Sequence, residues 1–203
     1  MLLCDRDIRK GMENGSILIT PFNEKQLNNV SYDLTVGDNW VVYKHSRHHA
    51  GSEIDVRVPK NSFRVKKGGG FKISPGHRIL GHSREFAGGT GKLFCEGKTV
   101  TSFIQATSTA GRIGLTACLC AGWGDVGYAN RWTLEILNVS PYSIFIPVGA
   151  VLAQICFELV DAPEKLYGKD TGSYQGASSD IKDLEADWSP ERHMMPRPMK
   201  VYI

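Results

Sequence analysis

The chain is built from short apolar segments separated by turns, and this spacing restricts the folds that it can adopt. Most of the segments are too brief for helices, and 22 glycines supply turns between them. Short strands bounded by turns favour an all-β barrel or sandwich with little helix. The expected strands span residues 17–19, 30–36, 40–43, 71–73, 78–81, 99–104, 113–119, 131–137, 144–146 and 151–159.

One helix is expected ahead of the strands, over about residues 5–14. Asp5 is a candidate N-cap, Ile8 and Met12 are four residues apart on one face, and Gly15 is the expected stop. The chain is thus expected to open with folded structure and not with a signal peptide.

Composition narrows the class of protein. A chain of 203 residues with 41% hydrophobic content is expected to form one well-packed domain. The net charge of +3 comes without a concentrated basic stripe, so a small polyanionic ligand fits better than a nucleic acid. Five scattered cysteines indicate reduced thiols in a cytoplasmic protein, and no apolar run approaches the ~20 residues of a membrane span.

Residues 125–138 place one acid in an otherwise apolar strand. Alternation sends Trp132, Leu134 and Ile136 to one face, so Glu135 and Thr133 project from the other. Glu135 is therefore expected to line a pocket or to reach solvent, behind a turn that carries a second acid, at position 125.

A second stretch, residues 106–115, sets a hydroxyl and a guanidinium four residues apart. In a helical turn Ser108 and Arg112 share one face. Small residues around them would let a ligand approach the backbone, and the guanidinium fork suits phosphate. Taken alone, the same residues also describe a serine-capped turn with a surface arginine.

Together and in this order, the two stretches resemble the signature of the dCTP deaminase family, within the trimeric dUTPase superfamily. Similar likenesses are found at the start of the chain, in residues 30–37 and in residues 147–157. The resemblance covers roughly residues 1–176, whereas residues 45–70 and the tail match poorly. It implies a mainly β, distorted barrel or jelly-roll-like domain over residues 1–162, a C-terminal lid segment and extended tail over 163–203, and a homotrimer with sites at the subunit interfaces.

The resemblance also implies site residues. Glu135 would be the catalytic proton shuttle in deamination of dCTP to dUTP, with Ser108 and Arg112 beside it, the latter pair supplied by a neighbouring chain. The substrate-binding positions would be Ala121, Asp125, Thr133, Tyr167, Lys169, Tyr174 and Gln175. Mg²⁺ would arrive with the substrate triphosphate, and no protein metal ligands are expected.

Departures from the family pattern keep other functions open. Thr107 and Trp123 stand where the family often has arginines, and Lys169 and Arg131 are the candidates to replace the lost charge. The substrate could then be dCTP, another phosphorylation state or a modified deoxycytidine nucleotide, as in a bacterial or phage-encoded enzyme. A dUTPase, a bifunctional enzyme giving dUMP, or a nucleotide-binding regulator without turnover are the alternatives.

Other motifs carry less weight. Residues 88–92 look like a phosphate loop, but Leu93 replaces the required hydroxyl residue. The H-x-E and P-C-x-x-C signature of zinc deaminases is missing from the sequence, so deamination without zinc is expected. His45, His48 and His49 are interpreted as loop-surface residues.

The C-terminal part is polar and proline-spotted. From residue 180 onward an extended arm or a partly ordered tail is expected, with Trp188 and Tyr202 as anchors on a neighbouring chain. Residues 167–175, rich in glycine and hydroxyls, are expected to close over bound nucleotide.

Overall fold

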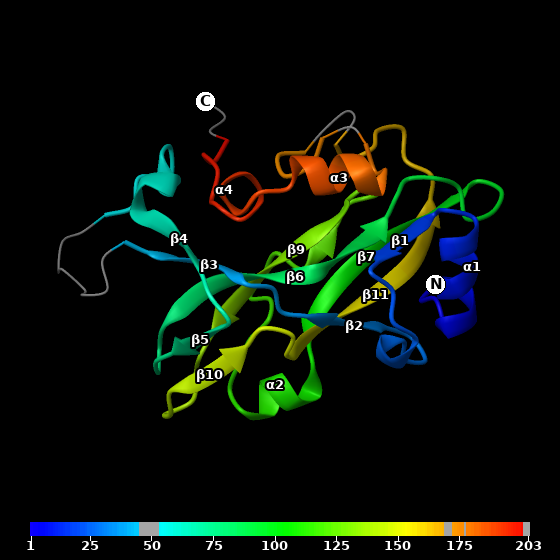
Figure 1. Ribbon diagram of the computed structural model, residues 1–203. Coiled ribbons are helices and arrows are strands. Elements are labelled where there is room, and N and C mark those ends of the chain that lie inside the picture. Colours follow the sequence, from blue (N-terminus) through cyan, green and yellow to red (C-terminus); the bar gives the residue numbers. More distant parts are fainter. Residues whose placement is uncertain (45–52, 169–171, 177, 201–203) are drawn as a thin grey trace.

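The computed structural model of the 203-residue chain describes residues 1–44, 53–168, 172–176 and 178–200. Strands dominate it and helices are short, which confirms the mainly β class (Figure 1). The helices are α1 (Asp5–Glu13), α2 (Ser108–Arg112), α3 (Ile181–Asp187) and α4 (Pro190–His193), with short 3₁₀ turns at Glu24–Gln26 and Pro59–Ser62. The strands are β1 (Ile17–Thr20), β2 (Tyr32–Thr35), β3 (Asn39–Tyr43), β4 (Phe63–Lys67), β5 (Gly70–Ile73), β6 (Arg78–Gly89), β7 (Lys98–Ala106), β8 (Trp123–Gly124), β9 (Ala129–Leu137), β10 (Ile144–Pro147) and β11 (Val151–Asp161).

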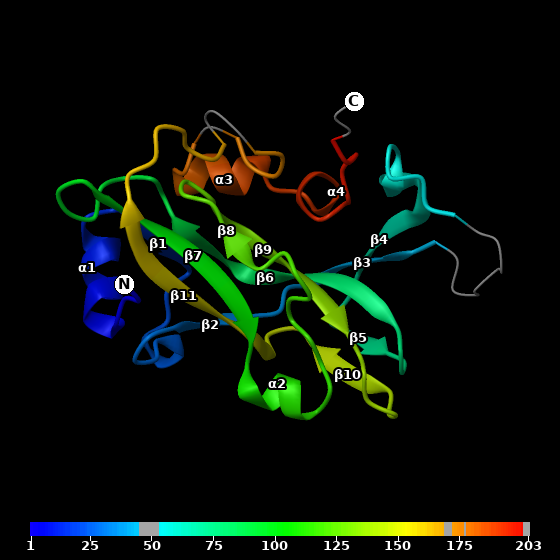
Figure 2. The same cartoon turned by 180° about the vertical axis from the view of Figure 1, so that it is seen from behind.

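The strands form two larger sheets and one two-stranded sheet. One sheet runs β1-β6-β3-β4 with β9 also paired to β6, the second runs β2-β11-β7-β8, and β10 pairs with β5. Figure 2, seen from behind, places β11, β7 and β8 together on one side of the molecule. The expected barrel is thus not closed among the described residues.

One apolar core lies between the two larger sheets. It combines Trp40 and Leu134 of the first sheet with Leu34, Ile104 and Phe157 of the second, all almost fully buried. Burial of this kind is the main favourable term in folding. The core fixes β9 against β6, and these two strands carry the site described below.

The N-cap of the N-terminal helix lies one residue earlier than the cap predicted from the sequence. Cys4 is the N-cap, and its backbone N–H and its thiol both donate to the carboxylate of Asp7. Asp5 is instead the first helical residue, where its charge favours the helix N-terminus. Ile8 packs into the core, and Gly15 follows the helix with φ of 75°, a conformation that glycine adopts readily.

Two strand predictions were wrong. β6 continues to Gly89, because Ser83 and Glu85 are buried in it as hydrogen-bonded residues although their sequence looks like a turn. Residues 113–119 form no strand; they carry a single bridge between Leu115 and Asn138.

The C-terminal segment is also different from the predicted extended tail. α3 and α4 fold back over the first sheet, with Leu184 and Met194 buried (Figure 1). Trp188 packs within its own chain, 4.7 Å from the ring of His82. These long-range contacts cannot be read from local polarity. Tyr202 and the histidines at 45, 48 and 49 lie outside the described residues.

Within the described ranges, no helix is both long and apolar enough to cross a membrane.

Candidate active site

β9 and β6 lie side by side and present polar and apolar side chains to the same face. The predicted alternation in β9 is confirmed: Trp132, Leu134 and Ile136 are buried in the core, whereas Thr133 and Glu135 are partly exposed on the opposite face. Glu135 is paired in register with Leu80 of β6. Directly opposed residues of antiparallel strands have side chains about 5 Å apart on one face, so Leu80 is the immediate neighbour of the carboxylate.

Glu135 has one carboxylate oxygen bound by the backbone and one facing an arginine. Oε2 accepts from the N–H groups of Leu119, Cys120 and Ala121 at 3.0, 3.0 and 3.3 Å. Oε1 accepts from Arg78 at 3.1 Å. Burial alone would raise the pKa of Glu135, but these donors outweigh it and hold the pKa below its usual 4.5. The side chain, only 14% exposed, is therefore an ionised carboxylate at neutral pH.

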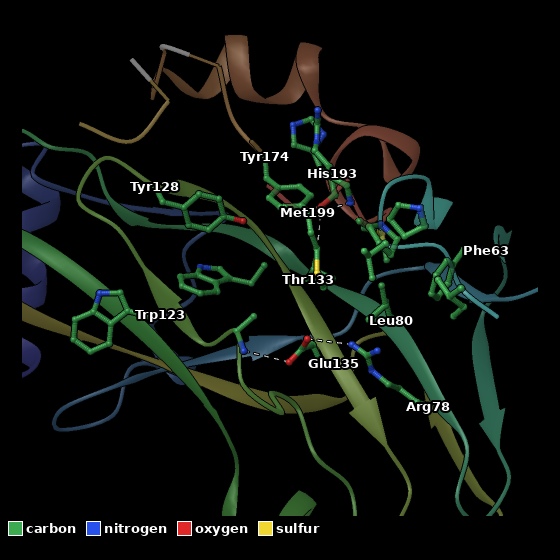
Figure 3. A pocket seen from close by; sticks show the side chains of 18 of the residues that line it. Phe63, Arg78, Leu80, Trp123, Tyr128, Thr133, Glu135, Tyr174, His193 and Met199 are labelled. Carbon is green, nitrogen blue, oxygen red and sulfur yellow. Dashed lines mark hydrogen bonds and ion pairs between the residues drawn. The ribbon is translucent and has the colours of Figure 1, made fainter. Parts of the chain in front are cut away.

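A cavity of about 440 Å³ opens above Glu135 (Figure 3). This size is typical of a small-molecule site, for which ~300–1,000 Å³ is usual. On one side of Glu135 in Figure 3 lie Trp123 and Tyr128, and on the other lie Leu80 and Phe63. The C-terminal segment closes the top, where the hydroxyl of Thr133 donates to the carbonyl of His193 at 3.2 Å.

A second cavity, of about 330 Å³, adjoins the first. Trp123, Asp125 and Tyr167 line both cavities, and Lys165 lines the second. The indole of Trp123 stacks on Phe103 with ring centroids 5.8 Å apart. An elongated ligand with one aromatic and one anionic end would fit the two cavities together.

Most of the predicted substrate-binding residues gather around the first cavity. Ala121, Asp125, Thr133, Tyr167 and Tyr174 all line it. Residue 169, a lysine, lies outside the described residues.

Gln175 has a different place, since it is buried behind the cavity. Its side-chain oxygen accepts from the N–H of Ala129 at 2.9 Å, and its amide donates to the carbonyl of Gly127 at 2.8 Å. Gln175 thereby fastens the C-terminal segment to the beginning of β9.

Ser108 and Arg112 do not line this cavity. Both are exposed on α2, which lies away from the C-terminal segment that closes the site (Figures 1 and 2). Thr107, and not Ser108, caps α2 by accepting from the N–H of Ala110. Within one chain the structure therefore brings Glu135 together with the backbone of 119–121 but not with the residues of α2.

Arg131 is also unavailable as a replacement cation for phosphate. Its guanidinium lies between the rings of Phe86 and Trp188, at 4.7 and 4.6 Å from their centroids. It supports the docking of α3 and α4, and it does not line either cavity.

Sequence reasoning missed Arg78 and the apolar residues at the far side of the cavity. Arg78 opens β6 with no motif to mark it, and only the strand pairing places it beside Glu135. The apolar residues come from distant segments, namely Tyr43, Ile54, Val56, Pro59, Phe63, Leu80, Met194, Pro196 and Met199. The one sequence signal for these apolar residues was the poor match of residues 45–70 and of the tail to the family pattern.

Among the residues that the structure describes, no group of three or more His, Cys, Asp or Glu side chains could hold a metal ion. A divalent cation at this site would have to bring ligands of its own, such as water and phosphate oxygens.

Comparison with known proteins gives consistent results. Residues 2–160 match the family model described as dCTP deaminase-like. A dCTP deaminase, dUMP-forming, from Methanopyrus kandleri is 30% identical over 182 residues, covering 86% of this chain and 91% of the relative. One with the same name from Persephonella marina is 33% identical over 181 residues, covering 87% and 92%.

A solved structure agrees at the level of the fold. The 2'-deoxycytidine 5'-triphosphate deaminase from Agrobacterium tumefaciens superposes with a TM-score of 0.55 at 18% identity. The match covers 77% of this chain and 47% of that one, so this chain spans about half of that protein's length.

Proposed function

The chain belongs to the dCTP deaminase-like family, and from this premise we propose that it is a hydrolase that converts the cytosine of dCTP to uracil. The observation that carries the proposal is the carboxylate of Glu135, which is largely buried, ionised and lines a nucleotide-sized cavity.

The cytosine base would lie along β9. The N–H of Glu135 bonds the carbonyl of Ala117, and its carbonyl accepts from Thr116, both on the edge of β9 that faces away from β6. Two residues earlier, Thr133 turns its own N–H and carbonyl to the same edge. The N–H would donate to N3 of the base and the carbonyl would accept from the exocyclic amine, which places C4 beside Glu135.

Glu135 would then act as base and acid in turn. It takes a proton from the water that attacks C4, so the C4–O bond forms, and it delivers this proton to N3. It then takes the second proton from the new hydroxyl on C4 and delivers it to the exocyclic amine, the C4–N bond breaks and ammonia leaves. The backbone N–H groups of Leu119, Cys120 and Ala121 hold the carboxylate in place through Oε2. In this scheme the carboxylate activates the water, so zinc is not required.

Ser108 and Arg112 would come from a neighbouring copy in a homotrimer. Their exposure on α2, away from the cavity of their own chain, is what such an arrangement requires. A serine hydroxyl and a guanidinium brought against Glu135 would stabilise the negative charge of the tetrahedral intermediate.

The sugar and phosphates would extend toward the second cavity. Asp125 and Tyr167 stand at its junction with the first, and Lys165 offers the positive charge that Arg131 does not. Mg²⁺ would neutralise the triphosphate, and Asp125 is the carboxylate that would face it. Residues 163–203 would serve as a lid, in which Tyr174 lines the site and Gln175 fastens the lid to β9. Lys169 would lie in the same lid.

A second candidate is the bifunctional reaction that ends in dUMP and pyrophosphate. Two observations favour it: the relatives from Methanopyrus kandleri and Persephonella marina carry the name dUMP-forming, and Asp125 lies where an acid could activate water for attack on the phosphates. A binding-only regulator is the remaining alternative, because Thr107 and Trp123 replace cations that the family often has.

The test is to incubate the protein with dCTP and Mg²⁺ and to resolve the products by ion exchange, with dUTP and dCMP offered in parallel. Accumulating dUTP identifies a deaminase alone, and dUMP identifies the bifunctional enzyme. The control is Glu135→Gln, which keeps the side chain's size and should lose about 10²- to 10⁴-fold in rate. Thermal protection by dCTP without any product would contradict the proposal and favour the regulator.

A further inference from the structure

The C-terminal segment brings one arginine to the wall of the first cavity. Arg197 lines this cavity together with Tyr174. It lies beyond residues 2–160, the part of the chain that the family model matches. Its role therefore has to be derived from its own surroundings and not from the family pattern.

The backbone around Arg197 is held at two points. The N–H of Arg197 donates to the hydroxyl of Tyr174 at 3.3 Å. Two residues later, the N–H of Met199 donates to the carbonyl of Val56 at 3.0 Å. A proline on either side of Arg197 restricts the backbone between these two anchors. The chain therefore loses little further freedom when the arginine contacts a ligand.

The guanidinium of Arg197 keeps most of its donors unused. It lies over the ring of Tyr174, 5.3 Å from the centroid, and one N–H donates to the carbonyl of Arg192 at 3.1 Å. Within the described part of the chain, this is the one hydrogen bond of a side chain that has five N–H groups, and no carboxylate pairs with it. Stacking occupies the flat face of the guanidinium and leaves its edge of N–H donors for an anion.

The neighbours of Tyr174 show which end of the first cavity Arg197 occupies. The hydroxyl of Tyr167 accepts from the backbone N–H of Tyr174 at 3.0 Å, so these two tyrosines adjoin. Tyr167 lines both cavities, and its ring meets that of Tyr128 with centroids 5.3 Å apart. Figure 3 shows Tyr174 next to Tyr128. Arg197 is therefore at the end of the first cavity that joins the second.

We propose that Arg197 binds the 5'-phosphate of the substrate, which is the phosphate attached directly to the deoxyribose. This inference rests on the proposed function, in which the base lies at Glu135 and the sugar extends toward the second cavity. The first phosphate then follows the sugar at the junction of the two cavities, beside the N–H edge of Arg197. A guanidinium suits this group because two parallel N–H groups can donate to two phosphate oxygens. The segment beyond the family domain thereby selects nucleotides over nucleosides.

The experiment compares equilibrium affinities for dCMP and deoxycytidine, which differ only in the 5'-phosphate. Every variant also carries Glu135→Gln, so that neither ligand is consumed. Because Arg197 is exposed and partly screened, Arg197→Gln should weaken dCMP about tenfold. The affinity for deoxycytidine should not change. Arg197→Lys keeps the charge without the planar fork and should recover part of the loss.

The matched control is Lys182→Gln. Lys182 is an exposed cation of α3, in the same C-terminal segment, and it does not line either cavity. Its removal changes the net charge by the same amount as Arg197→Gln. Both affinities should stay at their starting values.

The outcomes separate this inference from the proposed function. Equal weakening of both ligands in Arg197→Gln would show that Arg197 only holds the C-terminal segment, and it would overturn the inference. An unchanged affinity for dCMP, or dCMP binding no tighter than deoxycytidine with Arg197 intact, would overturn it as well and leave the deaminase in place. If the protein with native Glu135 gives no product from dCTP, the proposed function fails, while a phosphate preference that depends on Arg197 still supports the phosphate site.

Discussion

Glu135 is both largely buried and ionised, two properties that usually oppose each other. Three backbone N–H groups and Arg78 reconcile them. A carboxylate with a lowered pKa is a weaker base, but it is always ready to accept a proton at neutral pH. The sequence identified Glu135 through the alternation of β9, whereas Arg78 became visible only through the pairing of β6 with β9.

Arg78→Gln should shift the pH dependence of the reaction. Arg78 contributes to the lowered pKa of Glu135, so its removal raises that pKa. The catalytic form is the ionised one, so the acid limb of kcat/KM, which lies below pH 4.5 in the wild type, moves to higher pH. A pH–rate profile measures the shift.

The control for this change is Arg78→Lys, which keeps the positive charge and should leave the acid limb near its wild-type position. An unchanged limb in Arg78→Gln, with activity merely reduced, would mean that Arg78 only packs against the site.

His82 predicts how stability depends on acid. Burial, partly offset by the hydrogen bond to Ser83, lowers its pKa to about 4 from 6.5. The unfolded chain therefore binds more protons between these values, so the free energy of unfolding falls as the pH drops from 6.5 to 4. Denaturant unfolding at several pH values measures the slope. His82→Asn, which cannot titrate, should flatten it; an equal slope in the variant would refute the assignment.

At the scale of elements, local pattern predicted some strands and missed others. β9 was found because its side chains alternate between buried and partly exposed, and β11 because it is a long and largely apolar run. The prediction for β6 ended too early because the buried serine and glutamate in it resemble a turn. The helices α3 and α4 were missed because their few apolar residues become buried only by packing against β3 and β6, which are distant in the sequence. Long-range partners, and not propensity, decide these elements.

Trp188→Ala should loosen the C-terminal segment. The change removes the ring that stacks on Arg131 and contacts His82, and a cation–π contact contributes about 0.5–2 kcal/mol. Because residues 193–199 wall the cavity, the KM for dCTP should rise severalfold, and trypsin should cut after Arg192 faster. Trp188→Phe keeps an aromatic ring and should restore both. Equal KM and equal cleavage in the alanine variant would show that the segment does not depend on Trp188.

At the scale of the whole molecule, one chain brings together only some of the residues of the expected site. Glu135 and the cavity are in place, but Ser108 and Arg112 lie on an exposed helix elsewhere. The sequence likeness implied this division between subunits, and the position of α2 is what gives it a physical basis. An interface of this head-to-tail kind closes into a ring when the rotation permits.

Mixed assemblies test the division between chains. Arg112→Ala and Glu135→Gln should each be nearly inactive alone. Coexpressed in equal amounts, they should recover about a quarter of wild-type activity, because random assortment leaves that share of interfaces with both native residues. Light scattering should give the mass of three 22.4 kDa chains. No recovery in verified mixed trimers would place the complete site within one chain.

The most direct test of the central claim is the reaction of dCTP in ¹⁸O-labelled water, followed by mass spectrometry of the base and assay of ammonia. Hydrolytic attack at C4 predicts one ¹⁸O atom at O4 of the uracil base for each ammonia released. Glu135→Gln should give neither labelled uracil nor ammonia. Pyrophosphate cleavage would add label to phosphate without removing it from the base. Label in phosphate alone, with the cytosine unchanged, would contradict the account, because Glu135 would then not be acting on the base.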